Sequence, residues 1–321
     1  MRKLIALAAI CSVILMAAYF TACKDKKSET KTTSNTDSVN AMLERGKYLA
    51  TSVAACIDCH SKRDFTKYSG PVTPGTEGGG GMAFTEKWGL PGTLYGKNIT
   101  PDPETGIGTW TDDEVLRAIT QGISKNGDTL FPLMPYTNFN RMAKQDLLSI
   151  IAYIRTLNPI KNKVPERQLM VPIAMVYPAK FLQPSVDGNM MPAATDAVKY
   201  GEYLINMADC ASCHSPLTPQ GPDMSRKYAG GYVFDLGSNK VASANITSDS
   251  TTGIGTWTEE RFLNKFLPYR EEKNYDFDPG KQNTIMPLTL LCNMKDEDLK
   301  AIYAYLRTVK PIHNLVEKYP K

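Results

Sequence analysis

The chain contains few cysteines and histidines, seven and three respectively among its 321 residues. Four cysteines and two histidines lie in two short motifs, while Cys11 lies in the N-terminal apolar run and Cys23 closes that run. Only Cys292 is left for any other pairing, so we expect no disulfide framework. The fold must then be stabilised by its core and by whatever the two motifs bind. For Cys292 itself we favour a buried free thiol over a thiolate ligand.

The chain also lacks a strong excess of either charge. A total of 37 Lys and Arg against 33 Asp and Glu leaves a formal net charge of +4. This balance predicts no nucleic-acid partner. Patterns typical of strands are weak as well, and 230–234 is the one short segment that we expect to be extended. We therefore expect a mainly α fold.

Two motifs of the form Cys-x-x-Cys-His stand at 56–60 and 210–214. This spacing is the attachment signature of c-type haem: the thiols form thioethers with the porphyrin, and the histidine is placed to bind the iron. One such motif is expected by chance on the order of once in a thousand chains of this composition. The sequence therefore predicts two covalently bound haem c groups. The predicted attachment residues are Cys56, Cys59, Cys210 and Cys213, and the predicted proximal iron ligands are His60 and His214.

The sequence repeats itself about halfway along the chain. Gly-x-Tyr-Leu occurs at 46–49 and 201–204, Asn-Ile-Thr at 98–100 and 245–247, and Gly-Ile-Gly-Thr-Trp-Thr at 106–111 and 253–258. A similar Ala-Tyr-x-Arg-Thr segment lies near the end of each half. Such self-similarity predicts a duplicated structural unit. We call residues 41–160 the first copy and residues 196–321 the second copy, and we predict one domain for each.

Each copy is predicted to begin and end with a helix. In the first copy a capping box at 111–114 should start a further helix, and the last helix should run from about Gln145 to Asn158. Its counterpart in the second copy should end before Pro311. Between the copies, residues 161–195 contain five prolines, which favours an extended linker over a third domain.

The N-terminus resembles an export signal. Basic residues at positions 2 and 3 precede an uncharged run, which ends in a small residue before Cys23. We interpret residues 1–22 as a lipoprotein signal peptide, with Cys23 as the lipidated residue. An uncleaved membrane helix over Leu4–Ala22 is the alternative. Residues 23–40 are polar and are predicted to form a flexible tether. Both interpretations place the protein in the bacterial cell envelope, membrane-anchored and facing the periplasm or the cell surface.

A low-spin electron carrier needs a second iron ligand opposite each histidine, and methionine is the natural candidate. A ligand should recur in both copies, which leaves the pair Met134 and Met286 and the pair Met142 and Met294. Proline follows Met134 and Met286 directly and favours an extended loop, which can direct the thioether at an iron. Met142 and Met294 precede the last helix, where a methionine usually fills the core. We therefore predict Met134 as a ligand of the first haem iron and Met286 as a ligand of the second.

Other features have simpler interpretations. His313 has no histidine counterpart in the first copy and is predicted to lie at the surface. The tryptophans of the repeated hexapeptide, Trp110 and Trp257, are predicted to pack in the core and to line the haem edge. Their indoles, like the side chains of Asn98 and Asn245, are candidates for a bond to a haem propionate. Residues 78–81 loosely fit a dinucleotide fingerprint, but no strand precedes them and no helix follows, so we predict a loop.

Several of these segments together resemble class I cytochrome c domains. They are the haem motif, the run at 98–111, Met-Pro-Tyr at 134–136 and Ala-Tyr-Ile-Arg-Thr-Leu at 152–157. They are similar in particular to the multihaem cytochrome subunits of membrane-bound bacterial alcohol and gluconate dehydrogenases, over nearly all of 41–316. The resemblance implies two tandem class I domains, each a small helical fold around one covalent haem. The chain departs from the alcohol dehydrogenase subunits in carrying two haem units instead of three, and a lipobox instead of a C-terminal membrane anchor.

The leading functional hypothesis is one-electron transfer. Methionine opposite histidine would fill both axial positions of each iron, so no substrate could bind there. Redox partner proteins would be a dehydrogenase or a quinol oxidiser on one side and a downstream acceptor on the other. The alternatives are a dihaem peroxidase-like enzyme with one accessible haem, and a haem sensor or assembly subunit. We therefore favour an electron-transfer protein or subunit over a stand-alone enzyme, and we assign no catalytic residue.

Overall fold

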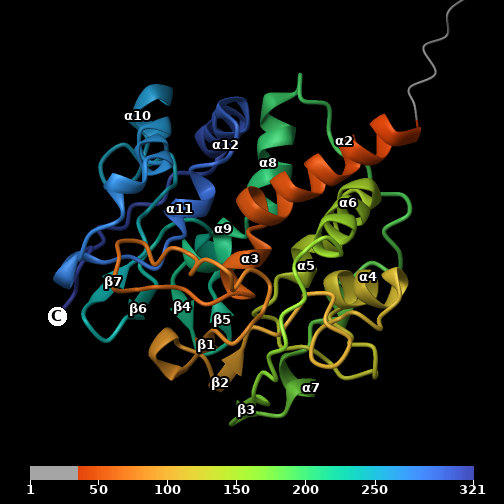
Figure 1. The fold of residues 1–321 in the computed structure, drawn as a ribbon. Coiled ribbons are helices and arrows are strands. Elements are labelled where there is room, and N and C mark those ends of the chain that lie inside the picture. The colour runs from red at the N-terminus through yellow and green to blue at the C-terminus, as the bar shows by residue number, and fades with distance from the viewer. Residues whose placement is uncertain (1–34) are drawn as a thin grey trace, which may run out of the picture. The chain divides into compact units, whose positions relative to one another are not determined.

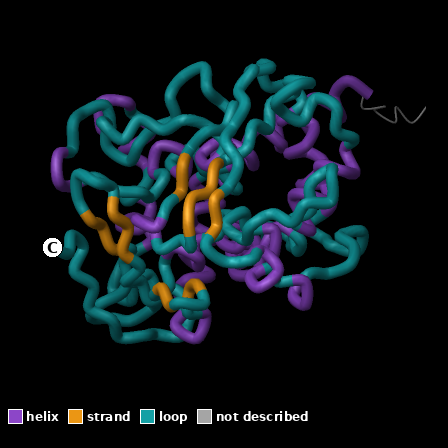
Figure 2. The backbone as a smooth tube through the Cα atoms, turned by 90° about the horizontal axis from the view of Figure 1, so that it is seen from below, coloured by secondary structure: helices purple, strands orange, loops and turns teal. Residues whose placement is uncertain are grey.

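The computed structural model describes residues 35–321. Helices make up most of the regular structure in this range, and the strands are short segments between long loops (Figure 2). The predicted signal peptide, Cys23 and the tether as far as residue 34 lie outside the described residues. Within the described range, no helix combines the length and the apolar character that crossing a membrane requires.

The first copy begins with helix α2 (Asn35–Tyr48), so residues 35–40 of the expected tether are helical. It continues into the π-helical turn η1 (Leu49–Val53) and the one-turn helix α3 (Cys56–Cys59). The predicted capping box is confirmed at the start of α4, where Thr111 and Glu114 each accept the other's backbone N–H. The remaining helices of this copy are α4 (Asp112–Gln121), α5 (Tyr136–Phe139) and α6 (Lys144–Ile154).

The second copy repeats this order, as Figure 1 shows in green to blue. Its helices are α8 (Ala197–Met207), α9 (Cys210–Cys213), α10 (Glu259–Leu263), α11 (Leu288–Leu291) and α12 (Asp296–Thr308). The last helix ends before Pro311, as predicted. Between the copies, the predicted linker contains the short helix α7 (Ile173–Val176) and a 3-10 turn at Ala179–Phe181.

The strands form three small antiparallel sheets. In the first copy β1 (Ala83–Phe84) pairs with β2 (Gly92–Tyr95), and the linker adds β3 (Gln168–Leu169) to the other edge of β2. In the second copy β4 (Leu217–Thr218) pairs with β5 (Gly221–Pro222), and β6 (Val233–Asp235) pairs with β7 (Lys240–Ala242). The expected extended segment at 230–234 thus overlaps β6.

A glycine lies where the first helix of each copy crosses the last. A Cβ added to Gly46 in α2 would lie 1.8 Å from the Ser149 carbonyl oxygen in α6. A Cβ on Gly201 in α8 would lie 1.9 Å from the Ala301 carbonyl oxygen in α12. Because no side chain fits in these gaps, the helix backbones touch. This explains why glycine begins the repeated Gly-x-Tyr-Leu segment.

One hydrophobic core extends through both copies. Leu147 and Ile151 of α6 belong to the same buried cluster as Leu204 of α8 and Leu299 of α12. Residues 41–321 accordingly form one compact unit. The predicted domain boundaries at 160 and 196 stay a prediction, since the two copies pack directly against each other.

Tyrosines of the repeated segment join the copies through a reciprocal pair of contacts. The Tyr203 hydroxyl donates a hydrogen bond of 2.7 Å to Asp146 of the first copy, and the Tyr48 hydroxyl donates to Asp298 of the second copy. Each hydroxyl also accepts a backbone N–H just before the carboxylate's helix. Arg45 adds two hydrogen bonds to Asp146, of 2.9 and 2.8 Å. An exchange of equivalent groups is the pattern of a two-fold interface.

The close helix crossing gives a stability prediction. Gly201→Ala forces a methyl group against the Ala301 carbonyl, so we expect the free energy of unfolding to fall by about 2–3 kcal/mol. The measurement is urea unfolding followed by circular dichroism. Gly188→Ala is the matched control, because nothing lies within 4 Å of an added Cβ there. Equal stability of the two variants would contradict the proposed packing.

Candidate haem attachment sites

Each Cys-x-x-Cys-His motif is folded as a single helical turn that follows a left-handed residue. Ala55 before α3 has φ 48°, and Asp209 before α9 has φ 50°. Non-glycine residues adopt this region at a cost, so the surrounding structure must hold them there. Cysteines three positions apart lie on the same face of a helical turn. Both thiols of each motif are therefore presented to the same side.

The histidine of each motif is oriented by a backbone carbonyl. His60 Nδ1 lies 2.7 Å from the Lys97 carbonyl oxygen, and His214 Nδ1 lies 2.7 Å from that of Ala244. Because a carbonyl only accepts, Nδ1 carries the proton, and the lone pair of Nε2 is left for a metal. Burial lowers the pKa of both imidazoles, which keeps them in the neutral form that binds iron.

The four cysteines are free thiols in the polypeptide. Cys56, Cys59 and Cys210 are partly buried, and Cys213 is exposed. Desolvation by the surrounding protein raises the pKa of the Cys56 and Cys210 thiols to about 12.

Met134 and Met286 lie in loops of the same conformation. Each is partly buried and packs against the main core cluster, as do Cys56 and Cys210. Pro135 and Pro287 follow with φ −79° in both loops, and the one-turn helices α5 and α11 then begin. The carbonyl oxygens of both methionines accept a backbone hydrogen bond of 2.8 Å from the residue two positions on. The two candidates thus share one local structure, while their ligation of iron stays a prediction.

The residues present fit a haem c group in both motifs. The donor set of two thiols, a neutral imidazole and a thioether is the set that c-type haem uses. A buried polar group also lacks a partner beside the second motif. Within the described residues, the Tyr228 hydroxyl is buried without a hydrogen-bond partner, and the nearby Cys210 thiol contributes to raising the pKa of this hydroxyl.

The two motifs lie close to each other in the middle of the fold, where α3 and α9 appear side by side in Figure 1. The Cys213 thiol is near enough to Cys59 to raise the pKa of the Cys59 thiol, and Asp58 of the first motif raises the pKa of the Cys213 thiol. The two candidate haem sites therefore lie near each other.

Several of the simpler interpretations are confirmed. Met142 and Met294 are 2% and 1% exposed core residues. Cys292 is a buried free thiol. The glycine-rich segment at 78–81 is a loop. Trp110 and Trp257 are partly buried and pack against the core.

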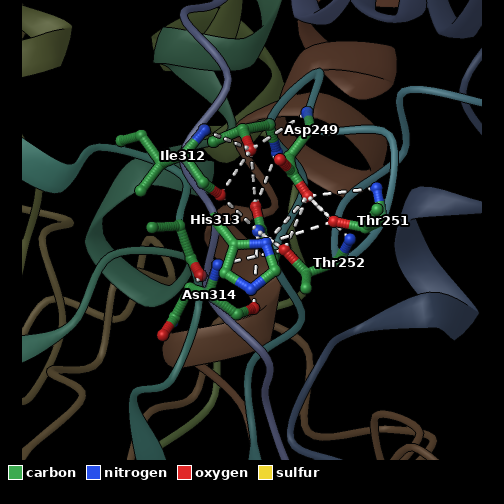
Figure 3. A network of polar contacts seen from close by, with 9 residues as sticks. Asp249, Thr251, Thr252, Ile312, His313 and Asn314 are labelled. Atoms are coloured by element: carbon green, nitrogen blue, oxygen red, sulfur yellow. Dashed lines mark hydrogen bonds and ion pairs between the residues drawn. The ribbon is translucent and has the colours of Figure 1, made fainter.

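His313 is a surface residue, with a side chain that is 71% exposed. Its Nδ1 lies 3.1 Å from the Thr251 hydroxyl and 3.8 Å from an Asp249 carboxylate oxygen (Figure 3). The same carboxylate accepts the backbone N–H and the hydroxyl of Thr252 at 2.7 and 2.8 Å. This network closes the repeated turn of the second copy and ties the C-terminal segment to it.

The repeated asparagines have a structural role in place of a contact with a propionate. Asn245 Oδ1 accepts the backbone N–H and the hydroxyl of Thr247, and Nδ2 donates to Thr252 and to the Ile312 carbonyl. Asn98 makes the equivalent four bonds. Both side chains are engaged within the protein, so the expected propionate contact is replaced by a turn-stabilising one.

Comparison with known proteins now adds to this geometry. Residues 198–310 match the cytochrome c family model. This range contains Cys210, Cys213, His214 and Met286. Residues 198–310 belong to the cytochrome c family. Membership implies a covalently bound haem c, and the duplicated first copy presents the same residue types at equivalent positions.

Relatives along most of the chain are also cytochromes. The chain is 29% identical over 287 residues to the gluconate 2-dehydrogenase cytochrome c subunit of Pantoea cypripedii, covering 84% of this chain and 60% of that protein. It is 30% identical to the cytochrome c subunit of the quinone alcohol dehydrogenase of Gluconobacter oxydans, covering 86% and 56%. It is 29% identical to a diheme cytochrome c-type protein of Cereibacter sphaeroides, covering 80% and 82%. The chain thus spans little more than half the length of the two dehydrogenase subunits.

The sequence reasoning missed the carbonyl groups that orient the histidines. Lys97 and Ala244 stand directly before the repeated Asn-Ile-Thr, which is the available signal for them. Backbone acceptors carry no residue-type signature, so only the position of the repeat points to them. It also missed Tyr228, because the first copy has glycine at the matching position.

The network around Asp249 gives a prediction on pH dependence. Hydrogen bonds from Thr252 and Thr251 hold the pKa of this carboxyl well below its ordinary value of 3.8. A depressed pKa stabilises the fold above pH 4, and the contribution is lost as the pH falls through the folded-state pKa. We expect Asp249→Asn to destabilise the protein more at pH 6 than at pH 2.5. Guanidinium unfolding at both pH values checks this, and an equal loss at both would contradict it.

Proposed function

We propose that the chain is a dihaem c-type cytochrome that carries single electrons between a dehydrogenase, or a quinol-oxidising partner, and a downstream acceptor. The cytochrome subunits of gluconate and alcohol dehydrogenases among its relatives support a dehydrogenase partner. The diheme relative supports two haems in one chain. Electron transfer is the function that the paired sites support best.

In each copy, the chain's own residues would attach the haem, orient its iron-binding histidine and complete the ligand set of the iron. The cysteine pairs would anchor the porphyrin, and His60 or His214 would bind the iron through Nε2. Bound haem c supplies one-electron chemistry between the ferric and ferrous states. Carbonyl acceptors at Nδ1 fix the imidazole plane and raise its basicity. Met134 and Met286 would complete the ligand sets, and a thioether ligand raises the reduction potential.

One observation carries this proposal: the Met-Pro loop has the same conformation in both copies. A peroxidase-like site requires one iron with an open or displaceable position. Two equivalent loops instead favour two closed, six-coordinate irons. The influence of the Cys213 thiol on the pKa of Cys59 indicates that the two motifs are near each other, which further supports electron exchange between the two haems within one molecule. We therefore favour a carrier over a haem enzyme.

The proposed location is the bacterial cell envelope. The basic and apolar N-terminus with Cys23 supports export followed by lipid anchoring. Residues 41–160 and 196–321 would be the two cytochrome c domains, with the linker at 161–195 between them. Incorporation of labelled palmitate into the protein, and its loss in Cys23→Ser, would test the anchor; equal labelling of both proteins would contradict it.

The haem stoichiometry tests the first part of the proposal. We expect two haems per chain from the pyridine haemochrome spectrum and from the intact mass of the purified protein. Replacing Cys210 and Cys213 together with alanine should remove one haem and leave one. Cys292→Ala, which alters a thiol outside both motifs, should keep both haems. A single haem in the unaltered protein would contradict a dihaem cytochrome.

The ligand assignment is tested by redox titration. Met134→Leu and Met286→Leu should each lower one reduction potential by on the order of 100 mV and leave the other nearly unchanged. Each should also remove about half of the methionine-to-iron charge-transfer absorbance. Met142→Leu and Met294→Leu are matched controls, because these methionines are buried in the core. An unchanged spectrum in either ligand variant would show that the assignment is wrong.

A further inference from the structure

The segment after the first haem motif lies directly on the distal loop of the second haem site. Ser69 Oγ donates a hydrogen bond of 2.7 Å to the Met286 carbonyl oxygen and accepts one of 2.9 Å from the Leu288 backbone N–H. One hydroxyl of the first copy thus bridges the residues on either side of Pro287. It fixes the short stretch of backbone from which the predicted ligand Met286 projects.

Asn283 reinforces this contact from the second copy. Its Oδ1 accepts the Ser69 backbone N–H at 2.9 Å, and its Nδ2 donates to the Phe65 and Lys67 carbonyls. Asn283 Oδ1 also accepts a hydrogen bond from the backbone N–H of Thr284. The Thr284 hydroxyl in turn accepts one from the backbone N–H of Met286. The chain leading to Met286 is therefore held by the side chains of Asn283 and Thr284, of which Asn283 also bonds to the first copy.

Arg63 links the same loop to the first haem motif. Arg63 Nη2 donates a hydrogen bond of 3.2 Å to the carbonyl oxygen of Ile285, the residue before Met286. The same nitrogen donates a hydrogen bond of 2.6 Å to the Ser69 carbonyl oxygen. Its Nη1 lies 3.1 Å from the carboxylate of Asp58, which is inside the first Cys-x-x-Cys-His motif. The Arg63 side chain is 1% exposed, so this charge is shielded from water and its contacts are strong.

The arrangement is buried and conformationally demanding. Ser69 is 0% exposed and has φ 64°, while Asn283 is 1% exposed. A left-handed serine costs free energy that its surroundings must offset. The described backbone hydrogen bonds of Met134 and Tyr136, in contrast, stay within the first copy. The first distal loop is joined to the second copy further along, where Asn138 Nδ2 in α5 donates a hydrogen bond of 2.7 Å to Asp209 Oδ1. Among the described residues, the contacts across the copies that reach the backbone on both sides of the methionine are those of the second distal loop.

We propose that Ser69 and Arg63 of the first copy are positioning residues for Met286, the distal ligand of the second haem. They hold the Met286 loop so that the thioether stays on the iron against competing ligands. Ligation in the second copy thereby depends on the segment that follows the first haem motif. This inference rests on the proposed function, because it takes Met286 as an iron ligand.

The test uses the full-length dihaem protein carrying Ser69→Ala. Losing both hydroxyl hydrogen bonds should make displacement of Met286 by added imidazole about tenfold more favourable. The second haem is identified as the one whose signals change in Met286→Leu. At that haem we also expect a weaker charge-transfer band and a lower potential, with the first haem unchanged. Imidazole titration of the ferric protein and redox titration measure these effects.

Two variants serve as controls. Lys67→Ala removes an exposed ion pair of the same segment with Asp276, away from Met286. Tyr48→Phe removes a contact between the copies that involves Asp298. Both should leave the imidazole affinity of the second haem unchanged. If Ser69→Ala does not fold, Arg63→Lys provides the test: it keeps the charge near Asp58 and should raise that affinity several-fold.

Three outcomes would overturn the inference. They are an unchanged imidazole affinity in the folded Ser69→Ala protein, an equal change at both haems, and the same change in Lys67→Ala. A wrong assignment of Met286 as an iron ligand would be recognised by a different result. In that case the Met286→Leu variant alone would leave both haem spectra unaltered.

Discussion

The hydrogen bond between each motif histidine and a backbone carbonyl is the interaction on which both candidate sites depend. It joins the helical turn of the cysteines to the residue before the repeated Asn-Ile-Thr turn, far along the chain. The asparagine of each Asn-Ile-Thr turn, Asn98 or Asn245, uses its side-chain amide to close the turn by hydrogen bonds. It also donates a hydrogen bond to a backbone carbonyl in the segment after the last helix. An imidazole that rotated freely would offer either nitrogen to a metal. Here the fold selects Nε2 and directs it.

The candidate residues of the sites could be recognised in the sequence because they are rare residue types at short, fixed spacing. The two Cys-x-x-Cys-His motifs and the two Met-Pro pairs can be identified without knowledge of the fold. The helices were predictable for a similar reason, since Thr111 and Glu114 form a local capping box. The predicted core methionines and the buried Cys292 follow from the repeat and from apolar surroundings.

Contacts between the copies could not be predicted in the same way. Ser69 carries no signature of its role, because its importance comes from a loop more than two hundred positions away. The reciprocal tyrosine contacts are similar: the repeat shows that Tyr48 and Tyr203 are equivalent, but not that each reaches the other copy. The asparagine turns illustrate the opposite error, in which a conspicuous polar residue proved to be structural. Long-range pairing is decided by packing geometry, which short sequence patterns do not contain.

The shared core has a consequence for how the protein unfolds. Since α6, α8 and α12 contribute to one buried cluster, neither copy can unfold without exposing apolar surface of the other. A protease that cut the exposed linker once would therefore leave both fragments associated, with their contacts intact. Unfolding should be a single cooperative transition, and both candidate haem sites should lose their structure together as the temperature rises. The duplicated chain thus has two candidate cofactor sites but one melting event.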